Sequence, residues 1–192
     1  MKKTLEKFVL FLNQRYDITP NTLTYIRIFT APWIALLISR ILAGKSLGLA
    51  IVTLVFYFLI VSTDFLDGIL ARAISSKGDS HDHSSGGMFD RLGDKIFIIF
   101  VLIPFGLNLF TFIIILAESA LAFQAIYSPS NKKQATKSGK LKMVLQTFLI
   151  PVLILQVVTN IIPDMVVYAY IIVTIISTCI SVYSHYFYFK ND

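Results

Sequence analysis

The chain has 192 residues, of which 56% are hydrophobic and only 15% charged, and its formal net charge is +6. A sequence this apolar is not that of a soluble domain, and it is typical of a protein with several membrane-spanning segments. A single cysteine excludes a disulfide framework and a cysteine-based zinc site. Because no basic soluble module is present, nucleic acid is not an expected partner.

The first seventeen residues predict an amphipathic helix that lies in the membrane interface. Leu5, Phe8, Val9 and Leu12 fall on one helical stripe, and the lysines and arginines lie elsewhere on the helix. No cleavage site of the signal-peptide type is expected here, since the small residues are missing. The alternative interpretation is an ordinary cytosolic extension.

Six apolar segments follow, and each is close to the ~20 residues that cross the hydrocarbon of a bilayer. They run approximately over residues 22–43, 47–73, 88–107, 109–127, 141–160 and 164–187. Glycine, proline and polar stretches separate them. We therefore expect an all-α polytopic membrane protein with one domain over residues 1–192, in which an interfacial helix (1–17) precedes a bundle of six transmembrane helices (22–189).

Lysine and arginine residues orient the predicted bundle. With six spans, both termini and the second and fourth connections share one side of the membrane. Of the seventeen lysines and arginines, only Arg40 and Lys45 fall on the other side. This bias predicts cytoplasmic termini, and the positive charge suits anionic lipid headgroups and phosphorylated substrates.

Four aspartates lie in the cytoplasmic turns of the second and third spans, where a carboxylate is costly. Asp64 and Asp67 are three residues apart and Asp90 and Asp94 are four apart, so each pair shares one helix face. If the two faces meet, the repulsion between the carboxylates requires a cation. Oxygen ligands without cysteine favour Mg²⁺ or Mn²⁺. The alternative is salt bridging to the basic residues near them, which are Arg72, Arg91 and Lys95.

The spacing of these aspartates resembles the signature of the CDP-alcohol phosphotransferase family. The residues that match are Asp64, Asp67, Gly68, Ala71, Arg72, Gly86, Asp90 and Asp94. The resemblance covers essentially the whole chain. Residues 20–24, followed by Arg27, fit the start of the first span, and residues 138–142, followed by Gln146, are similar to the phosphatidylglycerophosphate synthases of the family.

The connection between Arg72 and Gly86 is longer than the family usually has, with thirteen residues. It contains His81, Asp82 and His83. These residues suggest either a metal-binding tract or a solvated loop, and the glycine- and serine-rich composition favours the loop.

The resemblance implies an enzyme that transfers a phosphatidyl group from CDP-diacylglycerol to an alcohol and releases CMP. It implies two Mg²⁺ or Mn²⁺ ions, bound by Asp64, Asp67, Asp90 and Asp94, that neutralise the diphosphate. Asp94 is also the predicted general base, which accepts the proton of the acceptor hydroxyl.

The same resemblance indicates residues that contact the substrates. For CDP-diacylglycerol they are Asn21, Thr24, Gly68 and Arg72, although helix capping is the alternative role of Asn21 and Thr24. For the acceptor they are Lys140 and Lys142. An anionic acceptor, sn-glycerol 3-phosphate, is therefore expected, and phosphatidylglycerol, which would give cardiolipin, is the alternative. The family resemblance also suggests a homodimer.

A divalent-cation transporter is the alternative from a different class. A transporter should show polar residues along the full depth of several spans, or paired repeats. Here the aspartates stop near one face, and the last three spans hold only Glu118 and Asp164 as acids. We expect Glu118 to form a hydrogen bond or salt bridge between helices. The sequence thus favours an integral membrane enzyme with a cytoplasmic-facing site.

Overall fold

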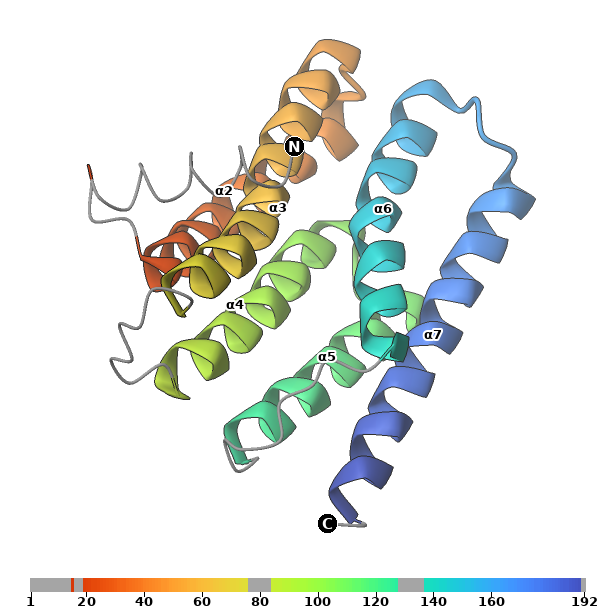
Figure 1. Cartoon of the computed structure of the whole chain (residues 1–192). Coiled ribbons are helices and arrows are strands. Elements are labelled where there is room, and N and C mark those ends of the chain that lie inside the picture. Colours follow the sequence, from red (N-terminus) through yellow and green to blue (C-terminus); the bar gives the residue numbers. More distant parts are fainter. Residues whose placement is uncertain (1–14, 16–18, 76–83, 128–136, 191–192) are drawn as a thin grey trace.

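Six long helices, joined in sequence order, make up most of the chain that the computed structural model describes, namely residues 15, 19–75, 84–127 and 137–190 (Figure 1). The helices are α2 (Pro20–Gly44), α3 (Leu47–Ser75), α4 (Ser84–Leu102), α5 (Leu109–Tyr127), α6 (Lys137–Thr159) and α7 (Asp164–Lys190). A short 3-10 helix, η1 (Ile103–Phe105), follows α4. The described residues contain no strand, so the predicted all-α class is confirmed. The predicted interfacial helix lies outside the described residues except for Arg15.

Four of these helices are long and apolar enough to cross a membrane. The four segments are Asn21–Gly44, Leu47–Leu70, Ser138–Thr159 and Asp164–Ser184. Within α5 the apolar stretch is shorter, Leu109–Gln124. The first turns of α4 carry aspartate, arginine and lysine, which lowers the hydropathy of that helix. Length and composition thus suit four of the described helices to a membrane, whereas six crossings, one domain, cytoplasmic termini and a homodimer stay predictions.

Helix α2 begins with a complete N-terminal cap. The side chain of Thr19 accepts a hydrogen bond from the backbone N–H of Thr22 at 3.3 Å, and the Thr22 hydroxyl accepts one from the Thr19 backbone N–H at 3.4 Å. Pro20 occupies the first helical position, where its missing N–H costs nothing. The cap of α2 is thus Thr19, and neither Asn21 nor Thr24 has the capping role that the sequence left open.

Helix α4 begins at Ser84, four residues before the predicted start at Met88. Residues 84–87 are two serines and two glycines, which predict a loop. They form the first turn of the helix instead. The backbone N–H groups of a first turn make no hydrogen bonds within the helix, so this turn depends less on residues that favour helices. This extra turn places Asp90 and Asp94 in the second and third turns of α4.

Buried residues recur every three or four positions on the helices that pack around α2, and they form a continuous seam. On α2 they are Thr24, Arg27, Ala31, Ile34, Ile38 and Ile41, on α3 Ala50, Thr53, Tyr57 and Ile60, and on α4 Gly93, Phe97 and Val101. Most of the seam is apolar and stabilises the fold by close packing. It turns polar at one end, where the start of α2, the end of α3 and the start of α4 lie together (Figure 1).

Helix α7 packs on both α5 and α6, and α6 also contacts α3. The hydroxyl of Tyr57 on α3 donates a hydrogen bond to the backbone carbonyl of Thr147 on α6 at 3.0 Å. The hydroxyl of Tyr170 on α7 likewise donates to the carbonyl of Leu145 at 3.0 Å. Tyr57 is buried and Tyr170 half-buried, and each thus satisfies its polar atom at a helix interface.

Candidate active site

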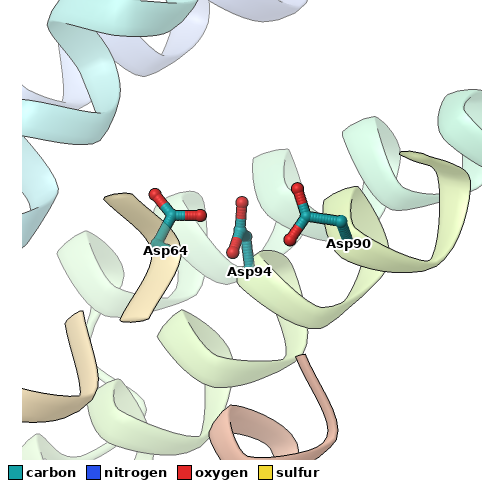
Figure 2. A group of neighbouring side chains, drawn as sticks. All are labelled: Asp64, Asp90 and Asp94. Atoms are coloured by element: carbon teal, nitrogen blue, oxygen red, sulfur yellow. The ribbon is translucent and has the colours of Figure 1, made fainter. Parts of the chain in front are cut away.

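Three carboxylates converge at the polar end of the seam, Asp64 from α3 and Asp90 and Asp94 from α4. One oxygen from each of the three lies within 4.8 Å of the other two. Figure 2 shows Asp94 between Asp64 and Asp90. Their side chains are 32%, 36% and 21% exposed in the order Asp64, Asp90 and Asp94, so that a ligand can reach them. The predicted meeting of the two aspartate-bearing helix faces is confirmed for these residues.

Arg27 of α2 lies among the three carboxylates. Its Nη1 atom is 3.2 Å from Asp64 Oδ1 and 3.5 Å from Asp90 Oδ1, and it also forms an ion pair with Asp94 Oδ1. The Arg27 side chain is only 2% exposed. Sequence reasoning named other basic residues as possible salt-bridge partners and missed this one. The spacing of the apolar residues over 31–41 was the available signal, because Arg27 lies four residues before Ala31 on the same helical stripe.

Close packing of α4 against α2 brings the carboxylates to Arg27. A Cβ atom at Gly93 would lie 2.5 Å from Thr24 Cγ2, closer than two carbon atoms approach without moving. The Thr24 hydroxyl, in turn, donates a hydrogen bond to Asp90 Oδ1 at 3.3 Å. Gly93 therefore contributes to the site by having no side chain, a role that sequence reasoning did not assign to it.

The other predicted contacts to CDP-diacylglycerol lie on the same helices. Asn21 is exposed in the first turn of α2, one turn before Thr24. Gly68 is half-buried on α3, one turn after Asp64. Asp67 and Arg72 also belong to α3, but their side chains are outside the described part of the structure, as is the loop that contains His81, Asp82 and His83. Their predicted roles stay predictions.

The two predicted acceptor lysines lie in different environments on α6. Lys140 is exposed near the start of the helix. Lys142 is buried, and its Nζ atom lies 2.8 Å from Glu118 Oε1 and 3.1 Å from Glu118 Oε2. Gln146 Nε2 donates to the same carboxylate at 2.7 Å and is 3.4 Å from the hydroxyl of Thr178 on α7. We call these four residues the Glu118 cluster, and the predicted interhelical role of Glu118 is confirmed.

The carboxylates near Arg27 suit a hard divalent cation. Mg²⁺ holds its oxygen ligands at about 2.0–2.1 Å, so two oxygens on opposite sides of the ion are about 4.2 Å apart. The span of 4.8 Å between the carboxylate oxygens is close to this value. Three carboxylates and one guanidinium leave an excess of two negative charges, which one divalent ion balances. Asp64, Asp90 and Asp94 therefore fit Mg²⁺ or Mn²⁺ in ligand type, charge and spacing.

Comparison with known proteins agrees with this chemistry. A family model described as CDP-alcohol phosphatidyltransferase matches residues 17–181, which is most of the chain. The matched region contains Arg27, the three carboxylates and the Glu118 cluster. The comparison with curated proteins and the comparison with solved structures each gave no match.

Proposed function

Because the chain belongs to the CDP-alcohol phosphatidyltransferase family, we propose that it transfers a phosphatidyl group from CDP-diacylglycerol to sn-glycerol 3-phosphate and releases CMP. Family membership makes it a membrane enzyme that moves a phosphatidyl group from a CDP-alcohol to an acceptor. The choice of CDP-diacylglycerol as the donor and of sn-glycerol 3-phosphate as the acceptor is the proposal. The convergence of Asp64, Asp90 and Asp94 at one end of the bundle carries the proposal, since it provides a cation site where a diphosphate needs one.

The carboxylates have two roles in the proposed reaction, metal binding and proton transfer. Asp64, Asp67, Asp90 and Asp94 would hold the divalent ions, of which the family resemblance implies two. When bound, such ions would neutralise the diphosphate and make its phosphorus more electrophilic. Asp94 accepts the proton of the acceptor hydroxyl while the acceptor oxygen bonds to phosphorus and the bond from phosphorus to CMP breaks.

The residues around the carboxylates position the nucleotide end of the donor. Thr24 is fixed beside Asp90 by their hydrogen bond, and Asn21 lies exposed one turn earlier on α2. Gly68 leaves the backbone of α3 accessible one turn beyond Asp64. We assign these residues, together with Arg72, to the CDP moiety, while the acyl chains stay in the bilayer.

Lys140 is the proposed contact to the phosphate of the acceptor. It is exposed near the start of α6, and a lysine ammonium is a suitable partner for phosphate. Lys142 is the second predicted acceptor contact, but its ammonium is already bonded to Glu118, so we propose that it positions the start of α6, and with it Lys140. A phosphorylated acceptor is therefore supported chiefly by Lys140.

A cation transporter has less support than an enzyme. Among the described side chains, the acids outside the carboxylate site are Glu118, which is paired with Lys142, and Asp164, which accepts a hydrogen bond from Gln156 at 2.7 Å. Neither extends the carboxylate site into a path across the described helices. The arrangement resembles a single reaction centre near one face.

Product analysis with the purified protein tests the proposal. We expect phosphatidylglycerophosphate and CMP from CDP-diacylglycerol and sn-glycerol 3-phosphate on thin-layer chromatography, no product in EDTA, and recovery with Mg²⁺ or Mn²⁺. The Asp90→Asn variant is the inactive control. If glycerol 3-phosphate does not react and added phosphatidylglycerol is converted to cardiolipin, the acceptor is phosphatidylglycerol instead. Mn²⁺ flux into proteoliposomes without CMP release would show that the protein is a transporter and not an enzyme.

A further inference from the structure

One nitrogen atom of Arg27 contacts all three carboxylates of the site. Nη1 lies 3.2 Å from Asp64 Oδ1 and 3.5 Å from Asp90 Oδ1, and it forms an ion pair with Asp94 Oδ1. These oxygens belong to the same three residues that can bind a metal ion. The guanidinium thus occupies the position between the carboxylates that a metal ion would also need.

Arg27 and the carboxylates depend on each other when no metal is present. The Arg27 side chain is 2% exposed, and a buried guanidinium is costly unless anions surround it. Three carboxylates within 4.8 Å of one another repel unless a cation lies among them. Arg27 therefore supplies the positive charge that allows α3 and α4 to present their aspartates to one point.

We propose that Arg27 is a resident counter-cation, which holds Asp64, Asp90 and Asp94 together in the metal-free protein and competes with the divalent ion for their oxygens. This inference rests on the proposed function in one respect, that a divalent ion binds at these carboxylates. Two cations cannot share one centre, so the guanidinium must release at least one carboxylate as the ion enters. Arg27 accordingly weakens metal binding and preserves the site between binding events.

Substitutions of Arg27 separate its charge from its shape. Arginine stays protonated in proteins, so Arg27→Gln removes the charge but keeps an N–H donor. Arg27→Lys keeps the charge on a more compact group. Arg40→Gln is the matched control, because Arg40 is exposed near the other end of α2 and its substitution changes the net charge by the same amount.

Mn²⁺ binding to the detergent-solubilised full chain, without lipid substrate, tests the competition. Electron paramagnetic resonance counts free Mn²⁺ in a titration, and thermal unfolding is followed in EDTA and in saturating Mn²⁺. We expect Arg27→Gln to bind Mn²⁺ at least about tenfold more tightly, because the repulsion between the guanidinium and the ion is gone. We expect the same variant to unfold at a lower temperature in EDTA and to recover in Mn²⁺. Arg40→Gln should match the unsubstituted chain in both measurements.

Unchanged or weaker Mn²⁺ affinity in Arg27→Gln would overturn the proposal, since Arg27 would then organise the ligands rather than compete for them. If Arg27→Gln does not fold in EDTA, it can be purified in Mn²⁺ and titrated against a chelator. Arg27→Lys should stay folded in EDTA and keep an affinity within about tenfold of the unsubstituted chain. If Arg27→Lys bound Mn²⁺ as tightly as Arg27→Gln, the positive charge of Arg27 would not be what weakens metal binding.

The proposed function can fail separately. If the unsubstituted chain binds no Mn²⁺, both the metal site and the competition are wrong. If it releases CMP in a Mn²⁺-dependent reaction but Arg27→Gln has unaltered Mn²⁺ affinity, only the competition is wrong.

Discussion

Two groups of charged side chains lie between the apolar helices, the carboxylate site of α2, α3 and α4 and the Glu118 cluster of α5, α6 and α7. In the carboxylate site, three carboxylates face one guanidinium, and their side chains are 21–36% exposed. In the Glu118 cluster, one carboxylate faces one ammonium, with side chains 2% and 6% exposed. The first group has excess negative charge and is accessible, whereas the second is neutral and closed.

This difference separates a ligand site from a structural contact. The Glu118–Lys142 pair is balanced and buried, so it leaves no charge for an external ion to balance, and together with Gln146 and Thr178 it links three helices. An excess of negative charge within reach of solvent is unfavourable until a cation arrives, so it indicates binding. Although both groups contain a basic residue, only the carboxylate site leaves charge for an external ion to balance.

The largest expected effect comes from the carboxylate site. Asp94→Asn should lower kcat by roughly 10²–10⁴-fold, because the amide cannot accept the hydroxyl proton. The variant should still bind Mn²⁺ and CDP-diacylglycerol, which equilibrium binding measures beside CMP release. Asp164→Asn, exposed at the start of α7, is the control and should retain full activity. Loss of Mn²⁺ binding together with turnover would mean that Asp94 acts only as a metal ligand and not also as the base.

In the Glu118 cluster the expected effect is on stability. Glu118→Ala should lower the free energy of unfolding by about 3–5 kcal/mol, because it leaves the Lys142 ammonium buried without its anion. The double variant Glu118→Ala with Lys142→Met should lose less than Glu118→Ala alone, because no buried charge is left without a partner, as measured by denaturant unfolding in micelles. Asp64→Asn should behave differently, since it reduces repulsion in the metal-free site and leaves Arg27 two other carboxylates. A similar loss for Asp64→Asn would contradict the distinction between the two groups.

Helix packing at the carboxylate site should be sensitive to one methyl group. Gly93→Ala would place a Cβ atom against Thr24 and push α4 away from α2, at a cost of about 1–3 kcal/mol in unfolding free energy. We expect reduced Mn²⁺ affinity and reduced turnover as well. Gly48→Ala on α3 is the matched control, because a Cβ atom there meets nothing within 4 Å. Equal behaviour of the two alanine variants would show that close packing at Gly93 is not required.

The smallest expected effect concerns the acceptor. Lys140→Ala should raise the KM for sn-glycerol 3-phosphate by about tenfold or less and leave kcat nearly unchanged, since the contact is present in the ground and transition states alike. Lys45→Ala, just beyond the far end of α2, serves as the control for lost positive charge. Steady-state kinetics with saturating CDP-diacylglycerol measures both the KM for sn-glycerol 3-phosphate and kcat. An unaltered KM would reopen the choice between glycerol 3-phosphate and phosphatidylglycerol.

Local spacing in the sequence determined the helical class and the aspartate pairs. Residues three or four apart share a helix face whatever the helix packs against, so Asp90 and Asp94 were predictable as neighbours. Long apolar runs likewise predicted helices close to those observed in the described residues. The start of α4 was misplaced by four residues because serine and glycine are compatible with both a loop and a first helical turn.

Only the tertiary structure decided which helix faces meet. Arg27 reaches Asp90 and Asp94 across 63 and 67 residues of sequence, and Lys142 reaches Glu118 across 24. Such pairs depend on helix order and on close approach at Gly93, and neither is encoded in the spacing along a single helix. The sequence by itself therefore determined that carboxylates would gather near one face of an all-α membrane protein. The packing of α2 against α3 and α4 determined that a guanidinium lies among them, because a buried charge takes the partner that the neighbouring helix presents.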